Sequence, residues 1–300
     1  MLKVLAINYS QSGQLNEIVD NFLFPIKEDT NFDIDRIVFD LEKPFPFPWT
    51  NDAFFDSMPE SVNETAQSLE KINYKHENYD IVILGYQPWF LSPSVPTSSL
   101  LQSSDFKKRI KSSKVITLIG ARNMWLNSQE SIKKYLKQAD ATLIGNVPLV
   151  DKTHNFTSAI TILYWMLTGK KEKFLGIFPK PGVAEDEIKD MTKFGDIFLT
   201  ANKNKEINKL QEKFLATGKI KILTSVMFVE LRGKELFKIW AKLIQSKPNS
   251  RKLIITLYKY YLLFAFFIVA PILLTILNIF VFPFTKSYFQ KKKSYFCGLE

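Results

Sequence analysis

The stretch that decides the fold is Leu2–Leu15, LKVLAINYSQSGQL. Its first seven residues form an apolar run typical of a buried parallel strand, and a polar turn that contains Gly13 follows. From Gln14 to Leu23 apolar residues recur at helical spacing on one face, at Leu15, Ile18, Val19 and Phe22. A strand, a Ser/Gly turn and an amphipathic helix in this order predict the first unit of a parallel α/β sheet.

Four further strands continue this alternation through the first 200 residues. We expect them at 33–39, 79–86, 114–120 and 141–149, with helices at 62–72, 94–103, 128–138 and 157–167, and an acidic helix at 184–199. Crossover helices between parallel strands produce a doubly wound sheet, which binds ligands at the carboxyl ends of its strands. The loops after the first, third and fourth strands, 9–15, 86–97 and 121–127, are therefore the predicted site.

Composition limits the chemistry that the chain can perform. Its 300 residues, 46% hydrophobic and 23% charged, are enough for a sizeable core and exclude wholesale disorder. The single cysteine, Cys297, excludes an intramolecular disulfide and a multi-cysteine metal site. The two histidines, His76 and His154, are too far apart for a zinc pair at helical spacing, so we expect no metal.

Charge is unevenly divided along the chain. Residues 1–200 carry 22 Lys/Arg and 25 Asp/Glu, whereas residues 201–300 carry 18 and 5. A basic third beside an apolar run favours an anionic membrane surface over nucleic acid. We therefore expect an α/β domain at 1–200, a basic amphipathic helical region at 201–250 and a hydrophobic membrane-associating segment with a basic tail at 251–300. The expected location is the cytoplasmic face of the inner membrane.

The apolar run itself extends from Leu253 to Phe284, and its last twenty-five residues, Tyr260–Phe284, carry no charge. As a helix they would cover roughly 37 Å, more than the hydrocarbon core of about 30 Å. Basic residues flank both ends and Pro271 divides the run, so a single span and a re-entrant hairpin with both ends on one side fit equally. The alternative to membrane embedding is a helix buried in the protein core.

Upstream of this run, Lys234, Lys238 and Lys242 recur at intervals of four residues. Apolar residues occupy the adjoining face of the same predicted helix, a pattern suited to the membrane interface. We therefore expect residues 234–293 to contact the membrane surface. A solvated basic face over a protein core explains the lysine row equally well.

The first candidate loop consists of Ser10, Gln11, Ser12, Gly13, Gln14 and Leu15. Two hydroxyls, a glycine and backbone N–H groups at a helix N-terminus can hold a phosphate monoester without a positive side chain. A simple Ser/Gly turn that caps the helix is the alternative. The loop lacks GxGxxG and GxxxxGK[ST], so dinucleotide or nucleoside triphosphate binding in those modes is not indicated.

The other two loops are rich in flat side chains. Pro88, Trp89 and Phe90 follow the third strand and could hold a planar ring, while Arg122 and Asn123 follow the fourth. Arg122 beside a flavin pyrimidine ring would stabilise the anion that forms when the ring accepts a hydride. The alternative is that these aromatic residues are core residues under the loops.

Taken together, Ser-x-Ser-Gly after strand one, Gly-Tyr-x-Pro-Trp after strand three and the loop after strand four resemble the flavodoxin-like FMN-binding family over residues 1–170. The resemblance implies strand order 2-1-3-4-5, with 10–15 around the FMN phosphate. It also implies that Pro88, Trp89 and Phe90 line the isoalloxazine and that Arg122 and Asn123 lie at its other edge. Many members have Thr or Asn where this chain has Leu15, so one phosphate ligand is absent or Asn16 replaces it.

Four features together are similar to bacterial dialkylresorcinol condensing enzymes: INYSQSGQL, GARNMW, the turn 151–155 and the hydrophobic C-terminal third. That resemblance implies oxidative aromatisation of a dialkylcyclohexane-1,3-dione beside a ketosynthase-like partner. Such a step needs a base, and His154 after strand five is the candidate by location, with Arg122 as the second catalytic residue. A lone histidine is also commonly structural, and Asp151 would orient it or cap the next helix.

Three functions remain open from the sequence. The first is an FMN-dependent oxidoreductase that takes a hydrophobic substrate from lipid. The second is a quinone or flavin reductase of the same fold that uses NAD(P)H. The third is a membrane-anchored scaffold for a ketosynthase partner without redox activity. A homodimer is compatible with each of the three.

Overall fold

The computed structural model describes residues 1–299. A five-stranded sheet forms its centre, built from β1 (Leu2–Asn8), β2 (Phe32–Val38), β3 (Ile81–Tyr86), β6 (Lys114–Ala121) and β7 (Thr142–Val150). Two short strands, β4 (Pro88–Trp89) and β5 (Ser92–Pro93), form a separate antiparallel pair. All pairings within the large sheet are parallel, and its order is β2-β1-β3-β6-β7.

This order confirms the predicted doubly wound, flavodoxin-like sheet of order 2-1-3-4-5. The five strands fall within two residues of their predicted boundaries because four are apolar runs, β2 alternates apolar and charged residues, and polar turns bound them. Alternate residues of one strand face opposite sides: Leu5 and Ile7 join one core cluster, whereas Val4 and Ala6 join the other.

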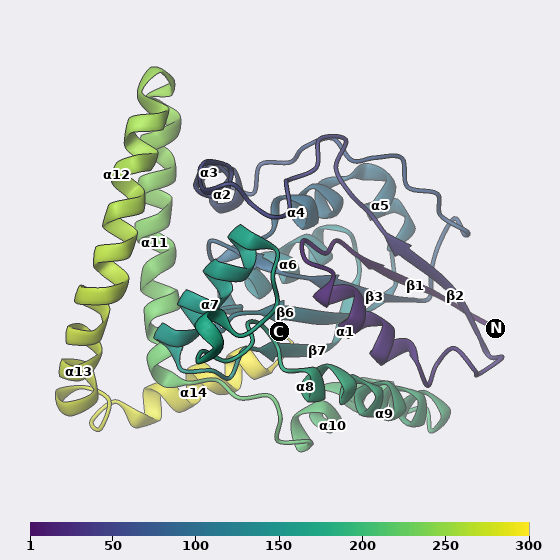
Figure 1. Ribbon diagram of the computed structural model, residues 1–300. Coiled ribbons are helices and arrows are strands. Elements are labelled where there is room, and N and C mark those ends of the chain that lie inside the picture. Colours follow the sequence, from purple (N-terminus) through teal and green to yellow (C-terminus); the bar gives the residue numbers. More distant parts are fainter. Residues whose placement is uncertain (300) are drawn as a thin grey trace.

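Helices cover both faces of the sheet (Figure 1). One face carries α1 (Gln14–Leu23), α8 (Glu185–Lys189), α9 (Met191–Lys203) and α10 (Leu210–Ala216). The other carries α4 (Val95–Gln102), α5 (Ser104–Arg109) and α6 (Leu126–Gln138). Helices α1 and α9 approach so closely at Gly195 that an added Cβ would lie 2.2 Å from the carbonyl oxygen of Phe22.

The remaining elements lie around this body. They are α2 (Asn51–Asp56), α3 (Met58–Val62), α7 (Asn155–Thr168), α11 (Thr224–Ser246), α12 (Arg251–Phe264), α13 (Ala270–Phe280) and α14 (Lys286–Cys297). Three 3₁₀ turns, η1 (Phe174–Gly176), η2 (Ile207–Lys209) and η3 (Pro248–Ser250), complete the chain with the π-helical segment η4 (Ala265–Val269).

Two helix predictions need correction. The helix expected at 62–72 is wrong: α3 ends at Val62, Glu64 has a left-handed φ of 54°, and the following segment is extended. That segment pairs with the chain after β2, where Glu42 N–H donates to Ser68 O at 3.0 Å. The helix expected at 184–199 is two helices, α8 and α9, separated by Asp190.

The C-terminal third is part of the body as well as an addition to it. Helices α11 and α12 form an antiparallel pair beside the sheet, and α14 then returns beneath α7 (Figure 1). Phe289 and Phe296 of α14 belong to one core cluster, and Leu210 and Phe214 of α10 belong to the other. Residues beyond 200 therefore contribute to both cores.

The apolar run forms one long helix. α12, η4 and α13 follow without interruption from Arg251 to Phe280. The wider π turn just before Pro271 accommodates a residue that has no N–H to donate and whose ring crowds the preceding turn. The chain does not turn back at Pro271, so the re-entrant hairpin is not present in the structure. The helical stretch Pro248–Phe280 contains an 18-residue window with a mean hydropathy of 2.6, and it is long and apolar enough to cross a bilayer.

Candidate functional site

The three predicted loops lie at one edge of the sheet. β1 ends at Asn8, β3 at Tyr86 and β6 at Ala121, and the parallel register aligns these carboxyl ends with one another. The edge is therefore the place where a doubly wound sheet binds ligands.

The turn between β1 and α1 offers unpaired donors. Gly13 has a left-handed φ of 84° at the N-cap of α1, a conformation that favours glycine, and the Ser10 hydroxyl accepts from the Leu15 N–H at 3.2 Å. The backbone N–H groups of Ser12 and Gly13 donate to no acceptor within residues 1–299. The Asn16 Oδ1 accepts from the Asn8 side chain at 2.7 Å, so its Nδ2 is the group that remains for the predicted role as a substitute phosphate ligand.

Two predicted ligands in this turn are already engaged. Gln11 donates from Nε2 to Pro46 O at 2.8 Å and accepts from the Tyr9 hydroxyl. Gln14 donates to Val183 O at 3.0 Å and accepts from Val183 N–H at 3.1 Å. Their side chains therefore hold neighbouring segments against the turn. The backbone and Ser12 are what the turn leaves for a ligand.

The aromatic loop is packed rather than open. Trp89 is 9% exposed, and its ring centroid lies 5.1 Å from Phe45, 5.2 Å from Trp49 and 6.0 Å from Tyr9. Pro88 and Trp89 form β4, which fixes the loop backbone. These residues fulfil the alternative prediction of core aromatics under the loop. A planar ligand can stack here only if the segment carrying Phe45 and Trp49 moves.

Phe90 faces a different group of residues. Its φ is 46°, and its ring lies 5.1 Å from Phe54 and 6.4 Å from Phe237 of α11. Phe90 therefore links the loop to the C-terminal third.

The loop after β6 is held by the first residue of α7. Arg122 Nη1 donates to Asn155 O at 3.1 Å and Oδ1 at 2.8 Å, and Asn123 Nδ2 donates to the same Oδ1 at 2.6 Å. Burial lowers the pKa of Arg122 to about 10, opposed by the attraction of Asp151, so the guanidinium remains charged at neutral pH. The guanidinium carbon also lies 5.3 Å from the centre of the Phe266 ring in η4. Arg122 thus lies between the sheet edge and the long apolar helix.

His154 is exposed at the N-cap of α7, next to Asn155. Its ring lies 5.6 Å from that of Phe156, and no hydrogen bond of its side chain occurs within residues 1–299. Asp151 does not orient it: Asp151 accepts from Thr153 N–H at 2.9 Å and from the Ser158 hydroxyl at 2.6 Å. Of the two roles predicted for Asp151, the structure supports fixing the start of α7.

Four buried polar atoms near this edge lack hydrogen-bond partners. They are the donors Nε1 of Trp49 and Nε2 of Gln87 and the acceptors Oδ1 of Asn8 and Oδ1 of Asn123. An unpaired buried polar atom costs about 1–3 kcal/mol, so such atoms in one region call for an explanation. Donors and acceptors together can pair with an imide, which presents two carbonyl oxygens around one N–H.

Sequence reasoning missed a buried carboxyl group beside the third loop. Glu230 of α11 is fully buried, and its Oε1 accepts from Asn127 N–H at 2.7 Å at the start of α6. Burial raises the pKa of Glu230 to about 8 although backbone N–H groups of 125–127 oppose the shift. Its Oε2 has no partner in the described chain. Glu230 is one of two acidic residues in a basic helix, and nothing in the local sequence distinguishes it from the exposed Glu235.

Lys234, one turn further along α11, also points inward. It is 8% exposed, contacts the Ser92 hydroxyl, donates to Leu91 O at 3.3 Å and lies 3.9 Å from a Glu64 oxygen. The predicted row of three lysines on one solvated or membrane-facing side is therefore wrong for Lys234. The adjoining face, including Phe237 and Trp240, packs against Tyr258 of α12 and does not face outward.

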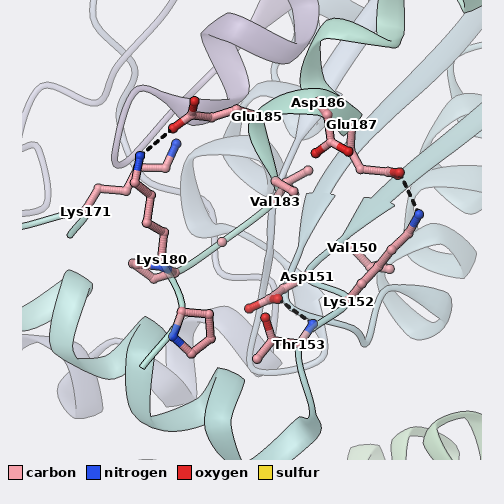
Figure 2. Close-up of a pocket in the computed structure, with 14 residues that line it drawn as sticks. Val150, Asp151, Lys152, Thr153, Lys171, Lys180, Val183, Glu185, Asp186 and Glu187 are labelled. Atoms are coloured by element: carbon pink, nitrogen blue, oxygen red, sulfur yellow. Dashed lines mark hydrogen bonds and ion pairs between the residues drawn. The ribbon is translucent and has the colours of Figure 1, made fainter. Parts of the chain in front are cut away.

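A cavity of about 410 Å³ lies beside the first turn, between the end of β7 and residues 179–187. Figure 2 shows two ion pairs among its charged groups, Lys180 with Glu185 at 3.0 Å and Lys152 with Glu187 at 2.7 Å. Gly182 and Val183 of its wall are the residues that contact Gln14. None of the three predicted loops lines this cavity.

The sequence matches no protein-family model and no curated protein. Solved structures provide remote similarities. One is a flavoprotein from Lactobacillus acidophilus NCFM in complex with FMN, with 16% identity and a TM-score of 0.40 over 49% of this chain and 93% of that one. Another is a putative flavoprotein from Bacteroides eggerthii DSM 20697, with 16% identity and a TM-score of 0.39 over 50% and 89%. Oxidised flavodoxin 1 from Bacillus cereus has 17% identity and a TM-score of 0.33 over 66% and 97%. These similarities are too remote to assign a ligand to the chain.

Proposed function

We propose that the chain is an FMN-dependent oxidoreductase. The observation that carries the proposal is the set of unpartnered polar groups at the carboxyl edge of a flavodoxin-like sheet. The free N–H groups of Ser12 and Gly13 suit the phosphate of FMN. The donors of Trp49 and Gln87 and the acceptor of Asn123 suit the imide edge of its ring.

Binding requires the packed rings to separate. Trp49 and Phe45 lie on the segment 44–49. The backbone of this segment accepts from the Gln11 side chain, and the backbone N–H of Trp49 donates to Met166 O of α7 at 2.8 Å. We infer that this segment moves outward as one piece and that Trp89 then faces the ring. The movement exposes the Trp49 indole N–H to the ligand instead of leaving it unpaired.

For the reaction we propose oxidative aromatisation of a dialkylcyclohexane-1,3-dione to a dialkylresorcinol. FMN, when bound, supplies the two-electron acceptor that takes a hydride from the ring carbon of the dione. The chain supplies the rest: a base removes one proton, for which we propose His154, and the Arg122 guanidinium stabilises negative charge at the ring edge. The loss of one hydride and one proton accounts for the two hydrogens by which the dione and the resorcinol differ.

The packing of Trp89 favours a second candidate. A chain whose aromatic cluster never opens would be a scaffold that recruits a ketosynthase-like partner, as a monomer or a homodimer. A quinone or flavin reductase driven by NAD(P)H uses the same flavin site and differs only in the electron donor.

Flavin titration of the full chain in detergent tests the proposal. We expect the wild type to quench the fluorescence of both FMN and riboflavin. Ser12→Asp places a negative charge at the proposed phosphate position, so FMN binding should weaken at least about tenfold while riboflavin binding, which involves no phosphate, stays unchanged. Asn123→Leu should weaken both, and Asn249→Leu, at an exposed asparagine remote from the sheet, should weaken neither.

The outcomes separate the candidates. A chain that binds neither flavin refutes the proposal and favours the scaffold. A flavin that is bleached by the dione without air supports the aromatisation, whereas bleaching by NAD(P)H alone supports the reductase. His154→Gln should abolish bleaching by the dione and leave flavin affinity unchanged.

A further inference from the structure

The long helix Arg251–Phe280 has one continuous exposed face. Residues at three- and four-residue intervals along it are exposed and almost all apolar: Leu253, Leu257, Tyr260, Phe264, Ile268, Ile272, Ile276 and Ile279. From Leu253 to Ile279 this face is roughly 40 Å long at 1.5 Å per residue. A monomeric soluble protein rarely exposes an apolar surface of this length.

The opposite face is buried near the start of the helix and contacts the protein at separate points further along, where Leu277 is the buried residue of 259–280. Ile254, Ile255 and Tyr258 are buried against α11 and α2–α3 at one end. In the middle, Phe156 of α7 lies 5.3 Å from Phe266 and 6.0 Å from Phe267, nearly parallel to the latter at 22°. The segment is therefore apolar all round because one of its faces contacts the protein and the other is exposed.

The protein holds the helix at both ends. At its start, Arg251 pairs with Asp56 at 2.7 Å and Glu60 at 2.9 Å. After its end, Phe282 packs 6.0 Å from Phe228 of α11 and 5.1 Å from Phe289, which is buried in the body. A helix that crosses a bilayer needs lipid around it over about 30 Å, whereas this helix is attached to the body at its start, its middle and its end, with α11 alongside it (Figure 1).

A second apolar surface adjoins the first. Leu163 of α7 is exposed, and the turn after α7 presents Leu175 and Ile177, which are 71% and 81% exposed. Phe174 of this turn packs on Tyr164 of α7 at 4.6 Å. Phe156 connects α7 to η4 of the long helix, so α7 lies between the long helix and this turn.

Lysines border both surfaces. Lys170, Lys173 and Lys180 flank the turn, and Lys252, Lys286 and Lys291 flank the long helix, all of them exposed. Apolar side chains surrounded by lysines match a bilayer with anionic headgroups, because the apolar side chains enter the acyl region and the lysines contact the headgroups. A protein partner would not require a basic border on every side.

We propose that the chain binds one leaflet of an anionic membrane, with the α12–α13 helix lying in the plane of the interface and the turn 174–177 inserted beside it. The body stays on the side from which it bound, and no segment crosses the bilayer. Arg122 then lies directly behind the inserted helix, 5.3 Å from Phe266, so the sheet edge faces the lipid. This inference does not depend on flavin binding, and its tests use no cofactor.

Vesicle flotation of the full chain tests the surface. We expect the wild type to float with phosphatidylcholine vesicles that contain phosphatidylglycerol and to float less with phosphatidylcholine alone. The double variant Ile268→Asp/Ile272→Asp should bind at least about tenfold more weakly, because charge is costly in the acyl region. Val38→Asp, at 56% exposure on β2 compared with 50% for Ile268, is the matched control and should bind as the wild type does. An unchanged circular dichroism melting curve confirms that each variant is folded.

Cysteine labelling tests the topology. In a Cys297→Ser background, Asn249→Cys and Ser287→Cys place a thiol on either side of the long helix. We expect an impermeant maleimide to label both on sealed vesicles. A thiol that reacts only after detergent is added would show a crossing helix and overturn the proposal. Two further results would also overturn it: no flotation with either vesicle, or a wild-type dimer that Ile268→Asp/Ile272→Asp converts to a monomer.

Discussion

Replacing Glu230 by glutamine should change how the stability of the protein depends on pH. Glu230 is fully buried at the start of α6, with Oε1 paired to Asn127 N–H and Oε2 unpaired. Its pKa is raised from 4.5 to about 8, so the folded state favours the protonated form. This carboxyl group therefore contributes stability that is fully present below about pH 4.5 and is lost as pH rises toward 8.

The size of the effect follows from the shift. A pKa unit corresponds to about 1.4 kcal/mol, so the free energy of unfolding should fall by about 3–5 kcal/mol between pH 4.5 and 8 through this one group. Glutamine keeps the shape and an accepting oxygen but does not ionise. We expect Glu230→Gln to match the wild type near pH 5 and to exceed its stability by several kcal/mol above pH 8.

Urea unfolding followed by circular dichroism, in steps from pH 5 to 9, measures the difference between the two proteins. Burial lowers the pKa of the neighbouring Lys234, and because both proteins contain this lysine its titration largely cancels in the comparison. Glu235→Gln, an exposed change on the same helix, is the control and should leave the pH profile unchanged. Parallel profiles for the wild type and Glu230→Gln would refute this account of the buried carboxyl group.

Two further substitutions probe how the body is assembled. Gln14→Ala removes both hydrogen-bond partners of the buried Val183 backbone, so we expect a loss of about 1–3 kcal/mol and faster hydrogen exchange at 179–184; unchanged exchange would contradict the pairing. Gly195→Ala places a Cβ 2.2 Å from Phe22 O, so α1 and α9 must separate; we expect a loss of about 1–3 kcal/mol or more in chemical denaturation, and a neutral result would contradict the close packing.

The sheet was predictable because its signals are local. Four strands are apolar runs and β2 alternates apolar and charged residues, and the turn at Gly13 directly follows the first strand. The helix predicted at 62–72 failed because a long-range pairing, between Leu41 and Leu69, overrides local helical periodicity. No local pattern in the sequence around Leu69 indicates that it pairs with Leu41.

The site was predictable in outline and not in detail. The carboxyl ends of the strands locate the three loops, but whether Trp89 is open or packed depends on Phe45 and Trp49, which are about forty residues away. Lys234 shows the same limit: its spacing from Lys238 suggested a shared outward row, yet Ser92 and Glu64 lie where it points. Contacts between distant segments determine both outcomes.

The return of α14 to the core means that this protein cannot be divided into an autonomous α/β domain and a dispensable tail. A truncation before Lys234 would remove the cation beside Glu64 and would remove Phe289 and Phe296 from the hydrophobic interior. The product would expose core surface and aggregate. Biochemical work therefore has to begin from the intact polypeptide.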